Sequence, residues 1–129
     1  MEKQSFEEKR EFLRYRYDQP ISFKVISSSR PGQESISRAL DAVAKNLSAC
    51  GVLFTSRFIP EISSIVALEM DYRTTRICRE LEENALIINN KVVGKVVRIE
   101  EDENGLYGVG VAFIKRLSRL PKSIESLIV

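Results

Sequence analysis

Alternating apolar and polar residues are the clearest pattern in the chain, and they predict β-strands. Residues 21–25 (ISFKV) follow the period of two that is typical of a strand with one buried face. Pro20 is expected to break the local structure just before this strand. The apolar residues 52–54 and the β-branched segment 62–72 predict two further strands.

Two longer segments near the C-terminal end predict a β-hairpin. Residues 86–99 are rich in β-branched side chains, and Asn89–Asn90 and Gly94 interrupt them as a bend or a bulge would. Residues 106–114 place Val109, Val111 and Phe113 on one face and Gly108, Gly110 and Ala112 on the other. Asn104–Gly105 lies between the two segments and is a strong signal for a tight turn.

Three segments have less decisive patterns. In residues 38–47, Leu40 and Val43 suit a helix, whereas Leu40, Ala42 and Ala44 suit a strand, so both alternatives remain. Residues 27–37 are rich in Ser, Gly and Pro and predict an exposed loop. The charged residues 73–84 predict either a loop or a helical turn.

The two ends of the chain differ from its middle. Residues 1–14 are mostly polar and predict a helical or flexible arm. In residues 116–129, Leu and Ile recur at helical spacing and Pro121 is well placed to open a helix. With about six strands in residues 15–115, the sequence predicts an all-β protein, a small antiparallel barrel with one or two terminal helices.

Composition excludes several classes of protein. The chain has 20 basic and 18 acidic residues and a net charge of +2, too little to indicate a polyanion partner by bulk charge. It has no His, which excludes His-based catalysis and metal ligation, and its two Cys are too far apart in sequence for a zinc motif. No apolar run could cross a bilayer and no apolar signal region is present. We therefore expect a cytoplasmic single domain without membrane insertion, metal or cofactor.

Two polar motifs each have a simple and a functional interpretation. Arg10 and Arg14 form an RxxxR spacing beside several Glu residues, which is typical of a solvated helix face but also suits an anion clamp. Residues 46–51 (NLSACG) suit a turn, with Cys50 as a small buried residue or turn member. They also suit a polar strand end that hydrogen-bonds a base edge. The glycines at 105–110 lack the spacing of a dinucleotide-binding loop and favour close packing of barrel strands.

Taken in order, these motifs resemble the PilZ domain family of bacterial cyclic di-GMP receptors. The resemblance rests on residues 9–14 (KREFLR), 46–51 (NLSACG), 92–99 (VVGKVVRI) and 108–114 (GVGVAFI). It covers roughly residues 8–115. Each motif is unspecific alone, but the four in this order are much more specific.

The resemblance implies a six-stranded antiparallel barrel with a flexible N-terminal arm and a C-terminal helix, and a binding role without catalysis. It implies that Arg10 and Arg14 bind the phosphate and guanine of cyclic di-GMP. Asn46 and Ser48 would read a guanine edge, and Gly51 would keep the backbone clear of the ligand.

Some positions depart from the family pattern or add to it. Glu11 stands where the family often has another Arg, and its charge would weaken anion binding if it pointed inward. Lys9 is a secondary candidate, because a basic residue there can favour a stacked ligand dimer, so the stoichiometry stays open. Gly110 is the other secondary candidate, and Cys50 stands where the family often has Gly.

The resemblance implies a receptor that changes conformation and regulates a separate protein partner in motility, pilus, exopolysaccharide or biofilm processes. The alternative is a ligand-independent PilZ adaptor that acts by protein–protein interaction. A single-stranded nucleic-acid binder is disfavoured, because the chain has no Trp and a net charge of only +2. An enzyme is least favoured, since no nucleophile–base pair is evident. The oligomeric state, monomer or homodimer, stays open.

A first prediction concerns the N-terminal arm. If residues 1–14 fold over the ligand, their amide hydrogens should exchange more slowly once cyclic di-GMP is bound. Hydrogen–deuterium exchange with and without the ligand measures this directly. Equal exchange in the two states would contradict an arm that closes over the site.

Overall fold

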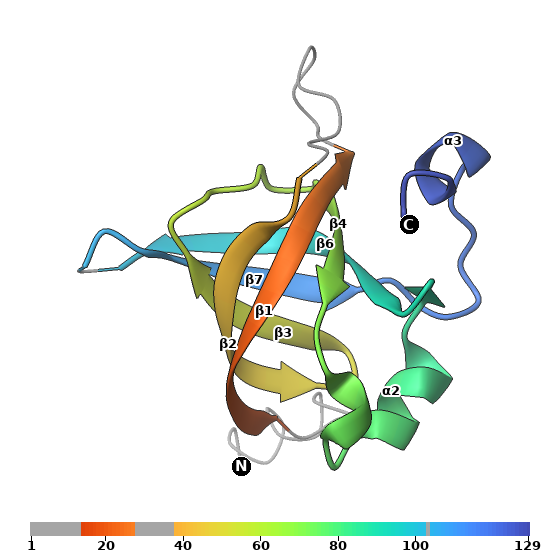
Figure 1. The fold of residues 1–129 in the computed structure, drawn as a ribbon, viewed down its shortest axis with the longest axis horizontal. Helices are drawn as coiled ribbons and strands as arrows, with labels where there is room; N and C mark the ends of the chain where they lie inside the picture. The colour runs from red at the N-terminus through yellow and green to blue at the C-terminus, as the bar shows by residue number, and fades with distance from the viewer. Residues whose placement is uncertain (1–13, 28–37, 103) are drawn as a thin grey trace, which may run out of the picture.

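The computed structural model describes residues 14–27, 38–102 and 104–129, which form an antiparallel barrel. The strands are β1 (Tyr15–Ser27), β2 (Leu40–Ser48), β3 (Gly51–Ser56), β4 (Ile65–Glu69), β5 (Ile87–Ile88), β6 (Lys91–Glu101) and β7 (Tyr107–Phe113). Six of them follow the order β4-β1-β2-β3-β7-β6, and pairing of β4 with β6 closes the barrel (Figure 1). The two-residue β5 pairs with β6 outside this ring. The predicted all-β, six-stranded barrel is therefore confirmed.

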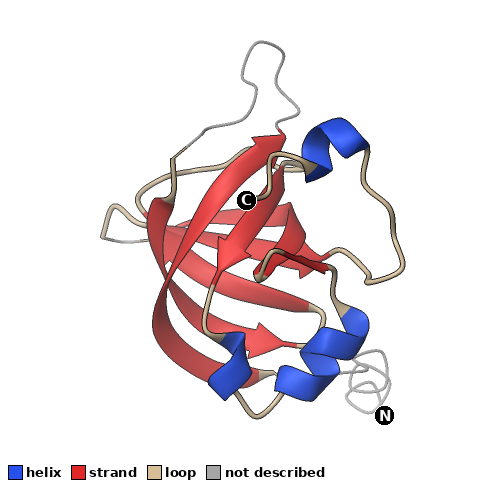
Figure 2. Ribbon diagram, turned by 45° about the vertical axis from the view of Figure 1, so that its right-hand side comes forward, coloured by secondary structure: helices blue, strands red, loops and turns tan. Residues whose placement is uncertain are grey.

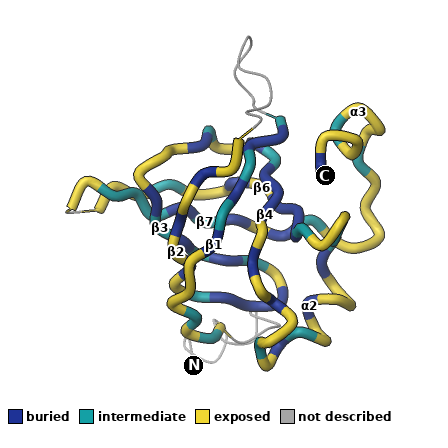
Figure 3. Tube along the Cα trace, viewed as in Figure 1, coloured by how far each residue is buried: buried dark blue, intermediate teal, exposed yellow. Residues whose placement is uncertain are grey.

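Buried and exposed residues alternate along much of the strands (Figure 3). In β2, the side chains of Leu40, Ala42 and Ala44 are buried. The strand alternative for residues 38–47 is thus correct and the helical alternative is wrong. In β7, Val109, Val111 and Phe113 are buried while glycine and alanine face outward, as the sequence predicts.

The barrel interior forms one apolar core. Its largest fully buried side chains are those of Phe23 and Phe54, whose ring centroids lie 4.9 Å apart and whose exposed fractions are 1% and 0%. A 3₁₀ turn, η1 (Tyr72–Thr74), and the helix α2 (Cys78–Asn84) follow β4 and lie at one end of the barrel (Figure 2). Leu81 of α2 belongs to the same buried cluster as the two phenylalanines, so this helical segment completes the core.

Three details of the strands differ from the sequence prediction. Strand β1 runs through Pro20, because β4 pairs only with Ser22–Ser27 and leaves one side of β1 unpaired at the proline. β4 is shorter than the predicted 62–72. Asn89 and Asn90, both with positive φ, form the turn between β5 and β6, whereas Gly94 continues β6 without a bulge.

The predictions for residues 73–84 and for the Asn104–Gly105 turn hold. Residues 78–84 are helical as α2, one of the two alternatives that the sequence left open. Gly105 has a φ of +75°, a conformation that favours glycine, and it lies in the connection from β6 to β7.

The predicted C-terminal helix over residues 116–129 is wrong in extent. Only α3 (Lys122–Glu125) is helical, and it begins directly after Pro121. Beyond it the chain leaves the helix so that Ile128 packs against Ile26, Ala67 and Val93 on the outside of the barrel. The Asn89 side chain donates a hydrogen bond to the Ile128 carbonyl oxygen at 2.7 Å. Tertiary docking therefore overrides the helical spacing of the apolar residues.

Among the described residues, no helix combines the length and the apolar character that crossing a bilayer requires.

The core predicts different effects of two phenylalanine substitutions. Phe54→Ala should lower the free energy of unfolding by about 3–5 kcal/mol, because it removes a fully buried ring and leaves a cavity. Phe58→Ala is the control and should lower it by about 1 kcal/mol or less, because the Phe58 side chain is 40% exposed. Urea unfolding measures both. Equal losses would show that the barrel interior does not dominate stability.

Candidate functional site

Two β-bulges turn polar side chains to the outside of the barrel. Lys45 is an extra residue in β2, so that Ala44 pairs with Phe54 and Asn46 pairs with Leu53. The alternation that buries Ala44 would otherwise bury Asn46 as well. Val97 is the corresponding extra residue in β6, and it brings the exposed Arg98 beside Gly110. Bulges change the direction of the following side chains in this way.

The register then aligns four residues across neighbouring strands. Asn46 of β2 pairs with Leu53 of β3, Leu53 pairs with Gly110 of β7, and Gly110 pairs with Arg98 of β6. Because directly paired residues point to the same side of a sheet, this row lies on the outer surface. Gly110, between Leu53 and Arg98 in this row, has no side chain and leaves space beside Arg98.

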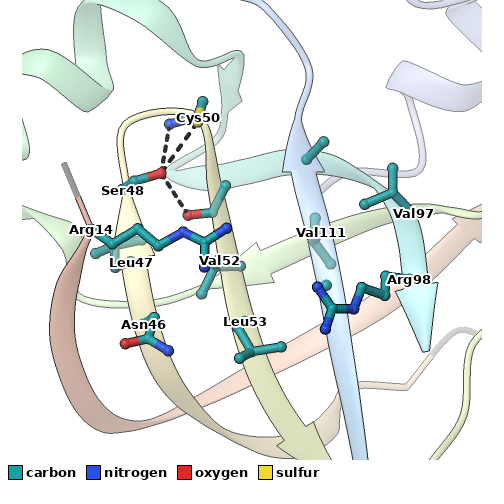
Figure 4. Close-up of a pocket in the computed structure, with 13 residues that line it drawn as sticks. Arg14, Asn46, Leu47, Ser48, Cys50, Val52, Leu53, Val97, Arg98 and Val111 are labelled. Atoms are coloured by element: carbon teal, nitrogen blue, oxygen red, sulfur yellow. Dashed lines mark hydrogen bonds between the residues drawn. The ribbon is translucent and has the colours of Figure 1, made fainter. Parts of the chain in front are cut away.

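That space is a surface hollow with a volume of about 260 Å³, which we call the outer hollow. Its polar members are Arg14, Asn46, Ser48 and Arg98, and Gly51 and Gly110 contribute backbone to its surface. Figure 4 shows Arg14 reaching across β2 and Arg98 reaching over β7 from the opposite side. The two guanidinium groups point toward one another over β3 and β7.

The Ser48 side chain stabilises the turn between β2 and β3. Its hydroxyl oxygen accepts the backbone N–H of Cys50 at 3.2 Å and lies 3.3 Å from the Cys50 sulfur (Figure 4). It also lies 3.5 Å from the carbonyl oxygen of Gly51, and the residue is only 5% exposed. Cys50 is an exposed turn residue, in agreement with one of its two predicted roles.

Glycine is present at the two positions of the outer hollow for different structural reasons. A Cβ atom at Gly51 would lie 2.6 Å from the carbonyl oxygen of Val111, closer than the neighbouring β7 backbone allows. A Cβ atom at Gly110 would lie 3.3 Å from the Cβ of Arg98, which is tight but less severe. Gly51 is therefore needed for the close approach of β3 and β7, and Gly110 keeps the surface open beside Arg98.

Acidic groups neutralise some of the nearby cations. The Arg16 side chain donates to Asp18 at 2.7 Å, and Lys45 lies 3.7 Å from the same carboxylate. The hydrogen bond from Arg16, more than the nearby positive charges, holds the pKa of Asp18 below its ordinary value. Among the described residues, no carboxylate forms an ion pair with Arg14. No carboxylate in the described part of the chain therefore neutralises its positive charge.

A second hollow of about 500 Å³ lies between the start of β1 and the η1–α2 segment. The Tyr17 hydroxyl donates to the Asp71 carbonyl oxygen at 3.2 Å, and the Arg76 guanidinium lies 5.6 Å from the Tyr15 ring centroid. Burial, and next the Asp71 charge, raises the pKa of Tyr17. The side chains of Arg16, Tyr17, Thr74 and Thr75 in this hollow already have hydrogen-bond partners within the protein. The outer hollow contains residues of both polar motifs and is the better candidate site.

The structure brings most of the predicted site residues together. Arg14, Asn46, Ser48, Gly51 and Gly110 all contribute to the outer hollow, although they come from separate parts of the sequence. Lys9 and Arg10, with the rest of the predicted arm up to residue 13, lie outside the described residues.

Sequence reasoning missed Arg98 as a site residue. Its strand was part of the family resemblance, but simple alternation from Val92 and Val96 assigns position 98 to the interior. The sequence does contain one indication, because Arg98 is a cation within an apolar, β-branched strand and a cation is poorly suited to burial. In the described part of the chain, no cluster of three Cys, Asp or Glu residues suits a metal ion.

Comparison with known proteins adds no assignment. No protein-family model matches the chain, and no curated protein sequence matches it. Membership of the PilZ family therefore stays a prediction, and the function has to be argued from the residues of the outer hollow.

The glycine geometry predicts a stability difference. Gly51→Ala should lower the free energy of unfolding by about 1–3 kcal/mol, because its Cβ would force β3 and β7 apart. Gly108→Ala is the matched control on β7, since the nearest atom to its Cβ would be 3.8 Å away. Urea unfolding compares the two variants. A Gly51→Ala variant as stable as Gly108→Ala would show that the strands separate at no cost.

Proposed function

We propose that this protein is a cyclic di-GMP receptor that binds the dinucleotide at the outer hollow and passes the signal to a protein partner. One observation carries the proposal. Arg14 precedes β1, whereas Asn46, Ser48 and Gly51 belong to the β2–β3 hairpin, and these residues share one hollow with Gly110. This is the combination that the two ligand-binding motifs of the resemblance require.

The chemistry of the outer hollow suits a guanine nucleotide. A guanidinium group such as that of Arg14 can donate two parallel hydrogen bonds to a phosphate or to the O6/N7 edge of guanine. The Asn46 amide has both donor and acceptor atoms for a base edge. Gly110 has no side chain, so a flat ring can approach the β7 backbone closely.

The size of the outer hollow indicates how much of the ligand it holds. Its volume of about 260 Å³ is below the ~300–1,000 Å³ of pockets that enclose drug-sized ligands. We infer that one guanine and a neighbouring phosphate occupy it while the rest of the dinucleotide lies across the surface. This leaves room for the predicted arm, with Lys9 and Arg10, to contact the exposed side of the ligand.

The hydrogen bonds of Ser48 change the role expected for this residue. Its hydroxyl already binds the turn at Cys50 and Gly51, and its side chain is buried. We therefore infer that Ser48 acts mainly as a positioning residue that fixes the hairpin, while Asn46 contacts the base.

A ligand-independent adaptor is the second candidate function. It is favoured by exposed apolar side chains in the connection between β3 and β4, where Phe58 is 40% exposed and Ile59 is 51% exposed. Such side chains can contact another protein. In this alternative, substitutions at Arg14 would leave partner binding unchanged.

Isothermal titration calorimetry with cyclic di-GMP tests the receptor proposal. We expect saturable binding, with GTP and cyclic di-AMP binding much more weakly. Arg14→Ala should weaken binding about 10- to 100-fold, because a charge-assisted hydrogen bond to the ligand is lost. The fitted stoichiometry distinguishes one bound ligand from a stacked dimer.

Arg79→Ala is the matched control, because Arg79 is an exposed arginine of α2 outside the outer hollow. It should bind like the unsubstituted protein. Absence of binding by folded protein, or equal losses for the two variants, would contradict the receptor proposal. The adaptor alternative would then be tested by a partner pull-down.

A further inference from the structure

Arg98 has a carboxylate partner beside the outer hollow. Its Nε donates to the Glu100 carboxylate at 2.8 Å, and a terminal nitrogen donates to the same oxygen. The two residues are two positions apart in β6 and both are exposed on the outer surface. The pair therefore lies at the rim of the outer hollow, with Arg98 on its surface.

A carboxylate on a guanidinium group occupies the same donor groups that a phosphate would use. Both anions accept hydrogen bonds from arginine N–H groups, and both favour the planar geometry of guanidinium. Glu100 therefore competes, within the molecule, with any anionic group that enters the outer hollow from the β6 side.

The surroundings allow Arg98 to change partner. The side chains of Arg98 and Glu100 are 63% and 56% exposed, so water can solvate either group once the pair opens. Exposed ion pairs of this kind are weak because solvent screens them. Gly110 pairs directly with Arg98 and has no side chain to fill the space beside it.

We propose that Arg98 is a second anion-binding arginine of the outer hollow and that Glu100 holds it when no ligand is bound. Ligand binding then exchanges the carboxylate for a phosphate of the nucleotide, with Arg14 on one side and Arg98 on the other. This inference rests on the proposed function, because it assigns a further ligand contact and its internal competitor to the same site.

The exchange has opposite consequences for substitutions at the two residues. Arg98→Gln should weaken cyclic di-GMP binding about tenfold, because one charged contact is lost. Glu100→Gln should strengthen binding about two- to fivefold, because Arg98 no longer has to leave a carboxylate. In the double variant Arg98→Gln/Glu100→Gln the gain from Glu100→Gln should disappear, since the two effects act through one side chain.

Glu83→Gln is the matched control for the charge change. Glu83 pairs with Arg79 at 3.5 Å on α2, so this substitution also removes the carboxylate of an exposed Arg–Glu pair. Calorimetry compares all variants with the unsubstituted protein. Tighter binding by Glu100→Gln but not by Glu83→Gln supports the proposal, and equal effects of the two substitutions overturn it.

The NMR signal of the Arg98 Nε–H group separates this inference from the proposed function. Glu100→Gln should shift that signal in the free protein, and cyclic di-GMP or inorganic pyrophosphate should shift it in the unsubstituted protein. If cyclic di-GMP fails to bind while pyrophosphate moves the signal, the receptor proposal fails and the anion exchange stands. If neither anion moves it, the exchange is wrong, whether or not cyclic di-GMP binds through Arg14.

Discussion

Closure of the barrel by β4 and β6 is the constraint on which the other features depend. Residues Ile65–Leu68 pair with residues Val92–Lys95, and this pairing joins the two ends of a six-strand ring. A closed ring reduces the unpaired strand edges and gives each of its strands an inner and an outer face. The inner face can then hold the Phe23–Phe54 pair, while the outer face becomes a continuous surface on which polar residues from distant parts of the chain meet.

The same closure explains the position of the candidate site. A small barrel needs strongly coiled strands, and β-bulges supply bending and extra twist. The bulges at Lys45 and Val97 serve that geometry and also reverse the side-chain direction that follows them. Asn46 and Arg98 consequently point outward, on either side of β3 and β7. The outward direction of these two polar side chains thus follows from the bulges that the closed barrel uses.

Strand β7 determines what lies between these polar groups. Its inward side chains are Val and Phe, and its outward positions are Gly108, Gly110 and Ala112. Small outward residues leave the β7 backbone without bulky side chains beside Arg98, and Gly51 lets β3 approach β7 closely. A surface with two opposed guanidinium groups over an open backbone suits a flat anionic ligand. The Glu100 carboxylate next to Arg98 gives this surface an internal anion in the absence of a ligand.

The sequence by itself determined the features that depend on local preference. Period-two alternation predicted the strands and the all-β barrel, because each strand must bury one face, and Asn104–Gly105 predicted a tight hairpin turn. The polar motifs at Arg14 and at 46–51 identified most of the described candidate residues. Only the tertiary structure decided which way Asn46 and Arg98 point, because one extra residue in a strand reverses a face without changing the composition. It also decided the conformation of the C-terminal segment, because the packing of Ile128 on the barrel outweighs the helix that the spacing of the apolar residues predicts.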